Sequence, residues 1–326
     1  MNKVPDNLIQ LVGTLNVDMQ NPDKLRRKTE EMKDLGYYGV YFNNIFFTME
    51  SPDYKCSEDD ILFREDKALI VQRSKEQLEQ IREIVENAGL TIPSSHFLNM
   101  LPEPGLPVEE IFSTHEKILD MAQIIGVERV TTHIGGIAVP TAAVAKERPT
   151  PAEKWENKKI TYEQYANLVK AQYGGVDKIV ADSIIVYKHL YEEATKRNII
   201  PTIETATSEL YEINTNAESI IKFIKDSGCD NMGICIDSGH CHLKNLGVAE
   251  IIRKCGDHFI ETHFHDNFGI KDEHNQVGIG TINWQEVISA MVETGYKGVV
   301  TFEQGDYVTN HRNWMLFIKR WEKHAI

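Results

Sequence analysis

The feature of this sequence that most limits its fold is a regular alternation of short apolar segments with helical patterns. Apolar runs of this length predict buried strands, and apolar residues spaced three or four apart predict helices that pack on them. Eight strand–helix units occur, and eight parallel strands close a barrel. The predicted strands are residues 9–15, 38–43, 91–97, 129–135, 199–205, 232–237, 259–266 and 298–304.

Helices are predicted between these strands, and their ends carry recognisable signals. Ser74 and Gln77 are spaced as a capping box, Gly89 follows the same helix, and Asn283 with Glu286 repeats the spacing. A doubly wound open sheet is the main alternative, but no glycine-rich turn follows the first strand. We therefore predict a single (β/α)₈ TIM barrel over residues 1–326, as one domain. The predicted helices are residues 22–35, 74–88, 108–125, 176–196, 217–226, 248–255, 283–294 and 314–323.

An insertion is predicted after the fourth strand, over residues 137–175, where the alternation stops. Prolines and glycines gather near its ends, and a short helix is expected around 162–171. Insertions of this length in compact domains usually serve as lids, binding loops or contact surfaces. We expect a lid or a subunit contact, the latter in a homo-oligomer.

The charge balance bears on the partners of the chain. Lys and Arg number 35 against 49 Asp and Glu, which gives a formal net charge of −14. This field repels phosphate backbones and anionic lipid, so neither nucleic acid nor a membrane is an expected partner. Five cysteines without a CxxC pair, and an N-terminus too polar for a signal peptide, predict a cytoplasmic protein with reduced thiols.

Ionisable side chains lie at or near the carboxyl ends of six successive predicted strands. They are His96, His133, Glu204, Asp237, His263 with His265, and Glu303. In a barrel these strand ends meet at one mouth, where active sites are built. Buried carboxylates in apolar strands are costly unless they are paired or bind a metal, so the set predicts a site.

Three carboxylates and one imidazole form the predicted metal site: Glu204, Asp237, His263 and Glu303. This oxygen-rich set suits a hard divalent cation, and we expect one ion, with Mn²⁺ first and Mg²⁺, Co²⁺ or Zn²⁺ as alternatives. Such an ion polarises a substrate carbonyl and hydroxyl. One carboxylate can then remove an α-proton and another return it, through an enediolate.

Four motifs resemble the xylose-isomerase-like TIM-barrel superfamily: IETATSE, CIDSGHCH, THFHDNFGIKDEHNQVGIGTINW and GYKGVVTFE. That superfamily contains sugar isomerases and epimerases as well as nucleases of the endonuclease IV type. The resemblance to its ketose epimerases implies that Glu204 and Glu303 are also the catalytic acid/base pair and that His240 binds substrate. Where those epimerases carry an arginine after the strand histidine, this chain has DNFGIK.

Further substrate-binding residues are expected around this centre. His96 and His133 are expected to line the sugar site. His265 shares a strand face with His263, so it either touches substrate or hydrogen-bonds to a ligand. The nuclease-like pattern in the loop after the seventh strand adds Asp272 and His274, which we expect to orient that loop or the substrate.

Three functions remain open. The first is a metal-dependent isomerase or epimerase of a sugar or sugar derivative. The second, also by resemblance, is a lyase that acts on 3-oxo-glycosides by the same first step, with a small partner subunit. The third is an endonuclease IV-like nuclease with three zinc ions, whose ligand pattern this chain fills; the acidic charge ranks it below the others. Its positions resemble His96, His133, Glu204, Asp237, His240, His263, Asp272, His274 and Glu303.

Overall fold

Eight parallel strands form the main sheet of the protein, in the order β10-β9-β8-β7-β6-β2-β1-β11. They are β1 (Leu11–Leu15), β2 (Gly39–Phe42), β6 (Ser94–His96), β7 (Arg129–Thr132), β8 (Ile200–Glu204), β9 (Gly233–Asp237), β10 (Phe259–His263) and β11 (Val300–Phe302). The computed structural model describes residues 3–15, 21–43, 45–49, 61–65, 68–97, 108–133, 170, 174, 176–206, 216–304 and 306–324.

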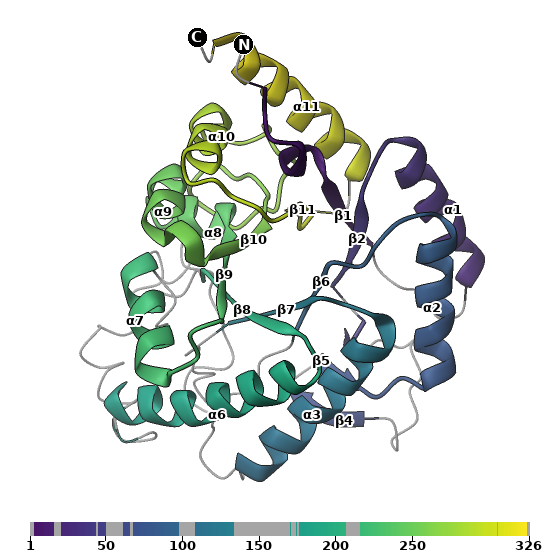
Figure 1. The fold of residues 1–326 in the computed structure, drawn as a ribbon, viewed down its shortest axis with the longest axis vertical. Helices are drawn as coiled ribbons and strands as arrows, with labels where there is room; N and C mark the ends of the chain where they lie inside the picture. Colours follow the sequence, from purple (N-terminus) through teal and green to yellow (C-terminus); the bar gives the residue numbers. More distant parts are fainter. Residues whose placement is uncertain are drawn as a thin grey trace.

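The sheet curls until its two outer strands meet. The backbone N–H of Phe264, just after β10, donates to the carbonyl of Thr301 in β11 at 2.9 Å. A parallel bridge between Phe264 and Phe302 continues this contact. The eight strands therefore form a nearly closed barrel with the helices on its outside (Figure 1), which confirms the predicted (β/α)₈ fold.

The helices surround the strands (Figure 1), and their buried apolar side chains form one core with those of the strands. They are α1 (Pro22–Asp34), α2 (Lys75–Asn87), α3 (Val108–Ile125), α6 (Val176–Lys196), α7 (Ala217–Ser227), α8 (Ser238–Leu243), α9 (Val248–Cys255), α10 (Trp284–Glu293) and α11 (Tyr307–His324). Two 3₁₀ turns, η1 (Asp6–Ile9) and η4 (Gly256–His258), complete the described helical elements.

The predicted capping box is complete at the start of α2, whereas only one of its two hydrogen bonds forms at the start of α10. Ser74 and Gln77 exchange both hydrogen bonds of a capping box at the start of α2, and Gly89 takes a left-handed φ of 71° after it. Asn283 accepts from the backbone N–H of Glu286, at 3.3 Å. The Glu286 carboxylate instead pairs with Arg253, at 2.6 Å, because α9 packs beside α10.

Three elements differ from the sequence prediction. A small antiparallel sheet, β3 (Phe47–Met49), β5 (Ala68–Val71) and β4 (Ile61–Glu65), follows β2. The short helix α8 begins directly at the end of β9, and α11 begins at Tyr307, seven residues before the predicted start. The predicted insertion, residues 137–175, and its helix lie outside the described residues except for parts near its end. The role of this insertion and the assignment of the chain to a single domain stay predictions.

The interior of the barrel holds a buried ion pair below the mouth. The Glu261 carboxylate of β10 is fully buried and accepts from Arg129 Nε at 2.5 Å. Ser94 and Thr301 donate to its other oxygen, at 3.1 and 2.9 Å. Barrel interiors are usually filled with branched apolar side chains. Here the layer is polar and its carboxylate is fully hydrogen-bonded, and it supports the strands that carry the candidate site.

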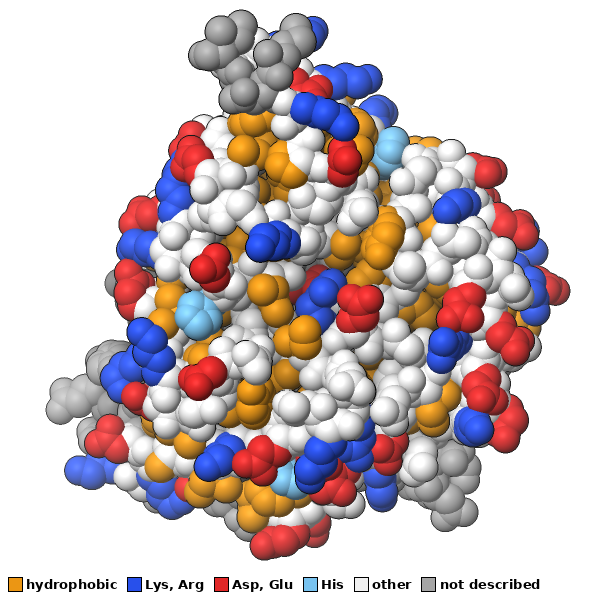
Figure 2. Space-filling view, viewed as in Figure 1, with side chains coloured by type: hydrophobic (Ala, Val, Ile, Leu, Met, Phe, Trp, Pro, Cys, Tyr) orange, Lys and Arg blue, Asp and Glu red, His pale blue; other side chains and the backbone are white. Residues whose placement is uncertain are grey.

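The surface shows no single-sign charge field on the face drawn in Figure 2, where Lys and Arg side chains alternate with Asp and Glu. Among the described helices, none is both long and apolar enough to cross a bilayer.

Candidate metal centre

Four strands each bring one of the predicted metal ligands to the same end of the barrel. Glu204 ends β8, Asp237 ends β9, His263 ends β10, and Glu303 directly follows β11. One donor atom from each of these side chains lies within 4.8 Å of the others. The parallel strand direction produces this convergence, because all the carboxyl ends of a parallel barrel face one mouth.

His263 contacts both glutamates through one ring nitrogen. Its Nδ1 is 3.1 Å from an oxygen of Glu204 and 3.7 Å from an oxygen of Glu303. The His263 side chain is fully buried, and the Glu204 side chain is 1% exposed while that of Glu303 is 10% exposed. The ring of Tyr41, from β2, packs in a T-shaped arrangement against the His263 ring, with centroids 4.9 Å apart, which restricts the orientation of the imidazole.

The two glutamates have opposite electrostatic environments. Burial opposes ionisation of Glu204, but His263 and His133 outweigh it and hold its pKa well below the ordinary value. Burial raises the pKa of Glu303, and the nearby carboxylates of Glu204 and Asp237 raise it further. Neighbouring carboxyl groups with pKa values pushed apart are the usual arrangement of an acid/base pair.

The residues of this group fit a divalent cation. Glu303 Oε2 is buried without a hydrogen-bond partner among the described residues. Three carboxylates converge here, and among the described residues no lysine or arginine forms an ion pair with Asp237 or Glu303. A cation held by Glu204, Asp237, His263 and Glu303 would neutralise this charge and occupy the unused oxygen.

A second donor group adjoins the first through Glu204. The Nε2 atoms of His96 and His133 each lie 3.5 Å from Glu204 Oε2. The two imidazole rings lie beside each other with centroids 5.3 Å apart. Burial lowers the pKa of His133 to about 4, although Glu204 opposes the shift, so this ring is neutral and able to act as a ligand or acceptor at neutral pH.

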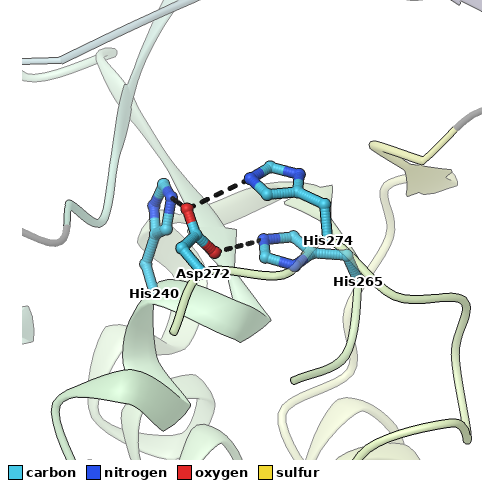
Figure 3. A group of neighbouring side chains, drawn as sticks. All are labelled: His240, His265, Asp272 and His274. Atoms are coloured by element: carbon cyan, nitrogen blue, oxygen red, sulfur yellow. Dashed lines mark hydrogen bonds and ion pairs between the residues drawn. The ribbon is translucent and has the colours of Figure 1, made fainter. Parts of the chain in front are cut away.

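A third group lies on the other side of Asp237 and is drawn in Figure 3. His240, His265 and His274 all point toward the carboxylate of Asp272. Asp272 Oδ2 is 3.3 Å from His240 Nε2 and 3.1 Å from His274 Nε2. The rings of His265 and His274 stack with centroids 3.8 Å apart and planes 4° from parallel.

His265 lies behind Asp237 and is fully buried. Its Nε2 is 2.9 Å from Asp237 Oδ1 and 3.0 Å from Oδ2, so it orients a predicted metal ligand. Asp237 Oδ1 also accepts the backbone N–H of His240 at 2.7 Å and thereby caps α8. A Cβ on Gly239 would lie 1.9 Å from the His265 ring, so only glycine leaves room for this ring.

All ten residues predicted for the site therefore meet at one end of the barrel, in three adjoining donor groups. A fourth donor group, Glu116, His189 and Glu193, lies elsewhere, between α3 and α6. It is partly exposed, and its Glu193 is already paired with Arg197 at 2.8 Å, so this group is a surface ion network.

One residue of the mouth was missed from the sequence, and another was predicted only as part of a group. The aromatic cluster from Tyr37 through Phe47 fits a pocket wall and ordinary core equally well from sequence, and its pattern does not single out Tyr41 as the ring that faces His263. Asp266 follows His265 directly and is fully buried, yet it belongs to none of the donor groups. Its neighbours in sequence gave no signal, because three of the four groups that donate to its carboxylate lie 12 to 18 residues further along the chain.

Fold and site together define a (β/α)₈ barrel with a candidate metal centre at the carboxyl ends of its strands. The family model described as xylose isomerase-like TIM barrel matches residues 30–321. The chain belongs to this family.

Known proteins similar to this chain include several sugar epimerases. A D-psicose 3-epimerase of Enterocloster bolteae is 29% identical over 97 residues, 29% of this chain and 30% of that protein. Alignments with the curated relatives span only 30% to 44% of those proteins. The fold is similar to that of a D-tagatose 3-epimerase-like protein, with a TM-score of 0.61 at 18% identity, over 97% of this chain and all of that one. A 3-keto-D-glucoside 4-epimerase of E. coli, YcjR, has a TM-score of 0.61 at 12% identity, over 95% and 98%.

Proposed function

We propose that this protein is a divalent-metal-dependent isomerase or epimerase of a sugar or sugar derivative. The observation that carries the proposal is the buried group of Glu204, Asp237, His263 and Glu303, within 4.8 Å of one another at the mouth. A bound divalent ion supplies Lewis-acid polarisation of a carbonyl and an adjacent hydroxyl. Membership of the family and the sugar epimerases among the similar proteins support the same chemistry.

The proton transfers are assigned to the two glutamates. Glu204 and Glu303 both approach Nδ1 of His263, at 3.1 and 3.7 Å, so two carboxyl groups from different strands lie next to each other at the proposed reaction centre. One glutamate removes the proton next to the carbonyl and the other delivers a proton to the resulting enediolate. Asp237 and His263 would complete the ligand set of the ion, while His96, His133 and His240 would offer imidazole groups to substrate oxygens.

The experiment that tests this proposal measures solvent-deuterium incorporation. The purified protein with Mn²⁺ is incubated in D₂O with D-psicose, D-tagatose, D-fructose and a 3-keto-glucoside, and each sugar is analysed by mass spectrometry. We expect one deuterium next to the carbonyl of a substrate sugar, and a loss of about 10²- to 10⁴-fold in Glu303→Gln. Absence of exchange in every sugar would refute the proposal. Elimination of the aglycone after exchange would identify the lyase outcome instead.

A second candidate is supported by one specific observation. The His96–His133 group and the His240–Asp272–His274 group adjoin the central one, as three zinc ions in an endonuclease IV-like nuclease would require. The net charge of −14 opposes binding to DNA. Cleavage of a duplex with an abasic site, together with about three zinc ions per chain by elemental analysis, would establish this function; an uncut duplex would exclude it.

A further inference from the structure

The loop between β10 and α10, residues 267–283, supplies two of the candidate site residues, Asp272 and His274. Its described residues form no strand or helix, so hydrogen bonds of regular secondary structure do not hold this loop in place. His274 takes a left-handed φ of 47°, which a side chain other than glycine rarely adopts. Such a conformation persists only where the surrounding structure enforces it.

The carboxylate of Asp266 contacts this loop at several points and at its exit into α10. Its Oδ2 accepts the backbone N–H of Gly278 at 3.0 Å and the indole N–H of Trp284 at 2.8 Å. Its Oδ1 accepts the backbone N–H groups of Asn267 and Ile282, at 2.9 and 3.2 Å. Four donors therefore converge on one fully buried carboxylate.

The backbone of Asp266 reinforces the same closure. Its N–H donates to the carbonyl of Asn275 at 2.8 Å, and the N–H of Asn275 returns the bond at 2.9 Å. Asn275 directly follows His274, so this pair of bonds fixes the chain next to the strained residue. A Cβ on Gly280 would lie 2.3 Å from Asp266 Oδ1, so glycine is what allows the loop to approach the carboxylate.

We infer that Asp266 is a positioning residue of the mouth: it holds the 267–283 loop so that Asp272 and His274 meet His240 and His265. The geometry in Figure 3 depends on that placement, because His240 comes from α8 and His265 from just after β10, while Asp272 and His274 come from the loop. The inference rests on the proposed function only in treating Asp272 and His274 as site residues.

The test compares Asp266→Asn with the control Ser289→Ala. Asparagine keeps the shape but presents an NH₂ group to two of the four donors. Ser289 accepts the indole N–H of Trp321 at 3.0 Å, so its replacement also removes an indole acceptor, between α10 and α11. We expect amide exchange in 267–283 to accelerate about tenfold or more in Asp266→Asn, with β8 and β9 unchanged.

A spectroscopic signature separates positioning from general stability. The stacked His265 and His274 rings shift each other's ring-proton NMR signals, so Asp266→Asn should move these signals towards those of isolated imidazoles while Ser289→Ala leaves them in place. Unchanged exchange and unchanged ring signals would overturn the inference. So would equal acceleration of exchange throughout the barrel.

A milder variant keeps the test decisive if Asp266→Asn fails to fold. Trp284→Phe removes one of the four donors and leaves the carboxylate in place. We expect a smaller acceleration confined to 267–283, and no local change would overturn the inference. All readouts use the metal-free protein without substrate. Failure of the proposed isomerase activity would therefore leave this result intact, and the reverse also holds.

Discussion

Replacing Glu303 by glutamine should have opposite effects on the stability of the metal-free and metal-loaded protein. Burial and the carboxylates of Glu204 and Asp237 raise the pKa of Glu303 in the folded chain. A carboxyl group with a raised folded pKa costs stability as pH rises above its unfolded pKa. The uncharged glutamine removes this cost at about pH 7.5. The metal-free variant should therefore be at least as stable as the wild type.

The metal-loaded protein should behave in the reverse way. At a free ion concentration about 100 times the dissociation constant, binding stabilises the wild type by about 2.7 kcal/mol. Losing one of four ligands weakens binding by about 100-fold, on the scale of single-group effects at metal sites, and the same ion concentration then contributes only about 0.4 kcal/mol. For a chain of this size these values correspond to shifts of roughly 5 °C and 1 °C in Tm.

The assay is thermal unfolding of both proteins with and without Mn²⁺, followed by near-UV circular dichroism. Glu116→Gln is the matched control, because Glu116 belongs to the exposed donor group with His189 and lies outside the mouth. The control should keep the full Mn²⁺ shift. An equal shift in Glu303→Gln and wild type, or a Mn²⁺ shift lost in Glu116→Gln instead, would refute the assignment of the site.

Three further outcomes are expected. Burial lowers the pKa of His115 to about 3 from 6.5, so the folded state loses stability as pH falls below 6.5. Between about pH 7 and 5, the free energy of unfolding in urea should therefore fall by about 2 kcal/mol less in His115→Phe than in the wild type. An equal fall in both proteins would contradict this. Arg129→Met should destabilise by about 3–5 kcal/mol in the same assay, because it leaves the Glu261 carboxylate buried without its partner; a loss under about 1 kcal/mol would count against the ion pair. Gly239→Ala should displace the His265 ring and weaken Mn²⁺ binding by about 10- to 100-fold in isothermal titration, and unchanged affinity would argue against its role behind Asp237.

The barrel and the first ligand group could be predicted from sequence because both follow from local pattern. Most of the eight strands lie in short segments rich in apolar residues, although β6 itself is polar, and parallel strands must place their carboxyl ends at one mouth. Glu204 and Asp237 therefore lie where their strand positions predict. The convergence of His96 and His133 on the same glutamate follows from the same rule.

What the sequence did not reveal depends on contacts between distant segments. The helix α8 is six residues long and contains a glycine, so its propensity is weak; it forms because the Asp237 side chain caps it. The role of Asp266 requires donors that the loop brings back from Gly278, Ile282 and Trp284. The small sheet of β3, β4 and β5 pairs strands of three to five residues across an acidic segment, where no alternation marks them.

Anomalous diffraction from a crystal grown with Mn²⁺ would show whether one cation is held by four side chains from four strands. We expect a single strong peak at the mouth, at about 2.0–2.3 Å from oxygen or nitrogen atoms of Glu204, Asp237, His263 and Glu303. A mouth without a peak at saturating Mn²⁺, or a peak bound only by His240, Asp272 and His274, would contradict it.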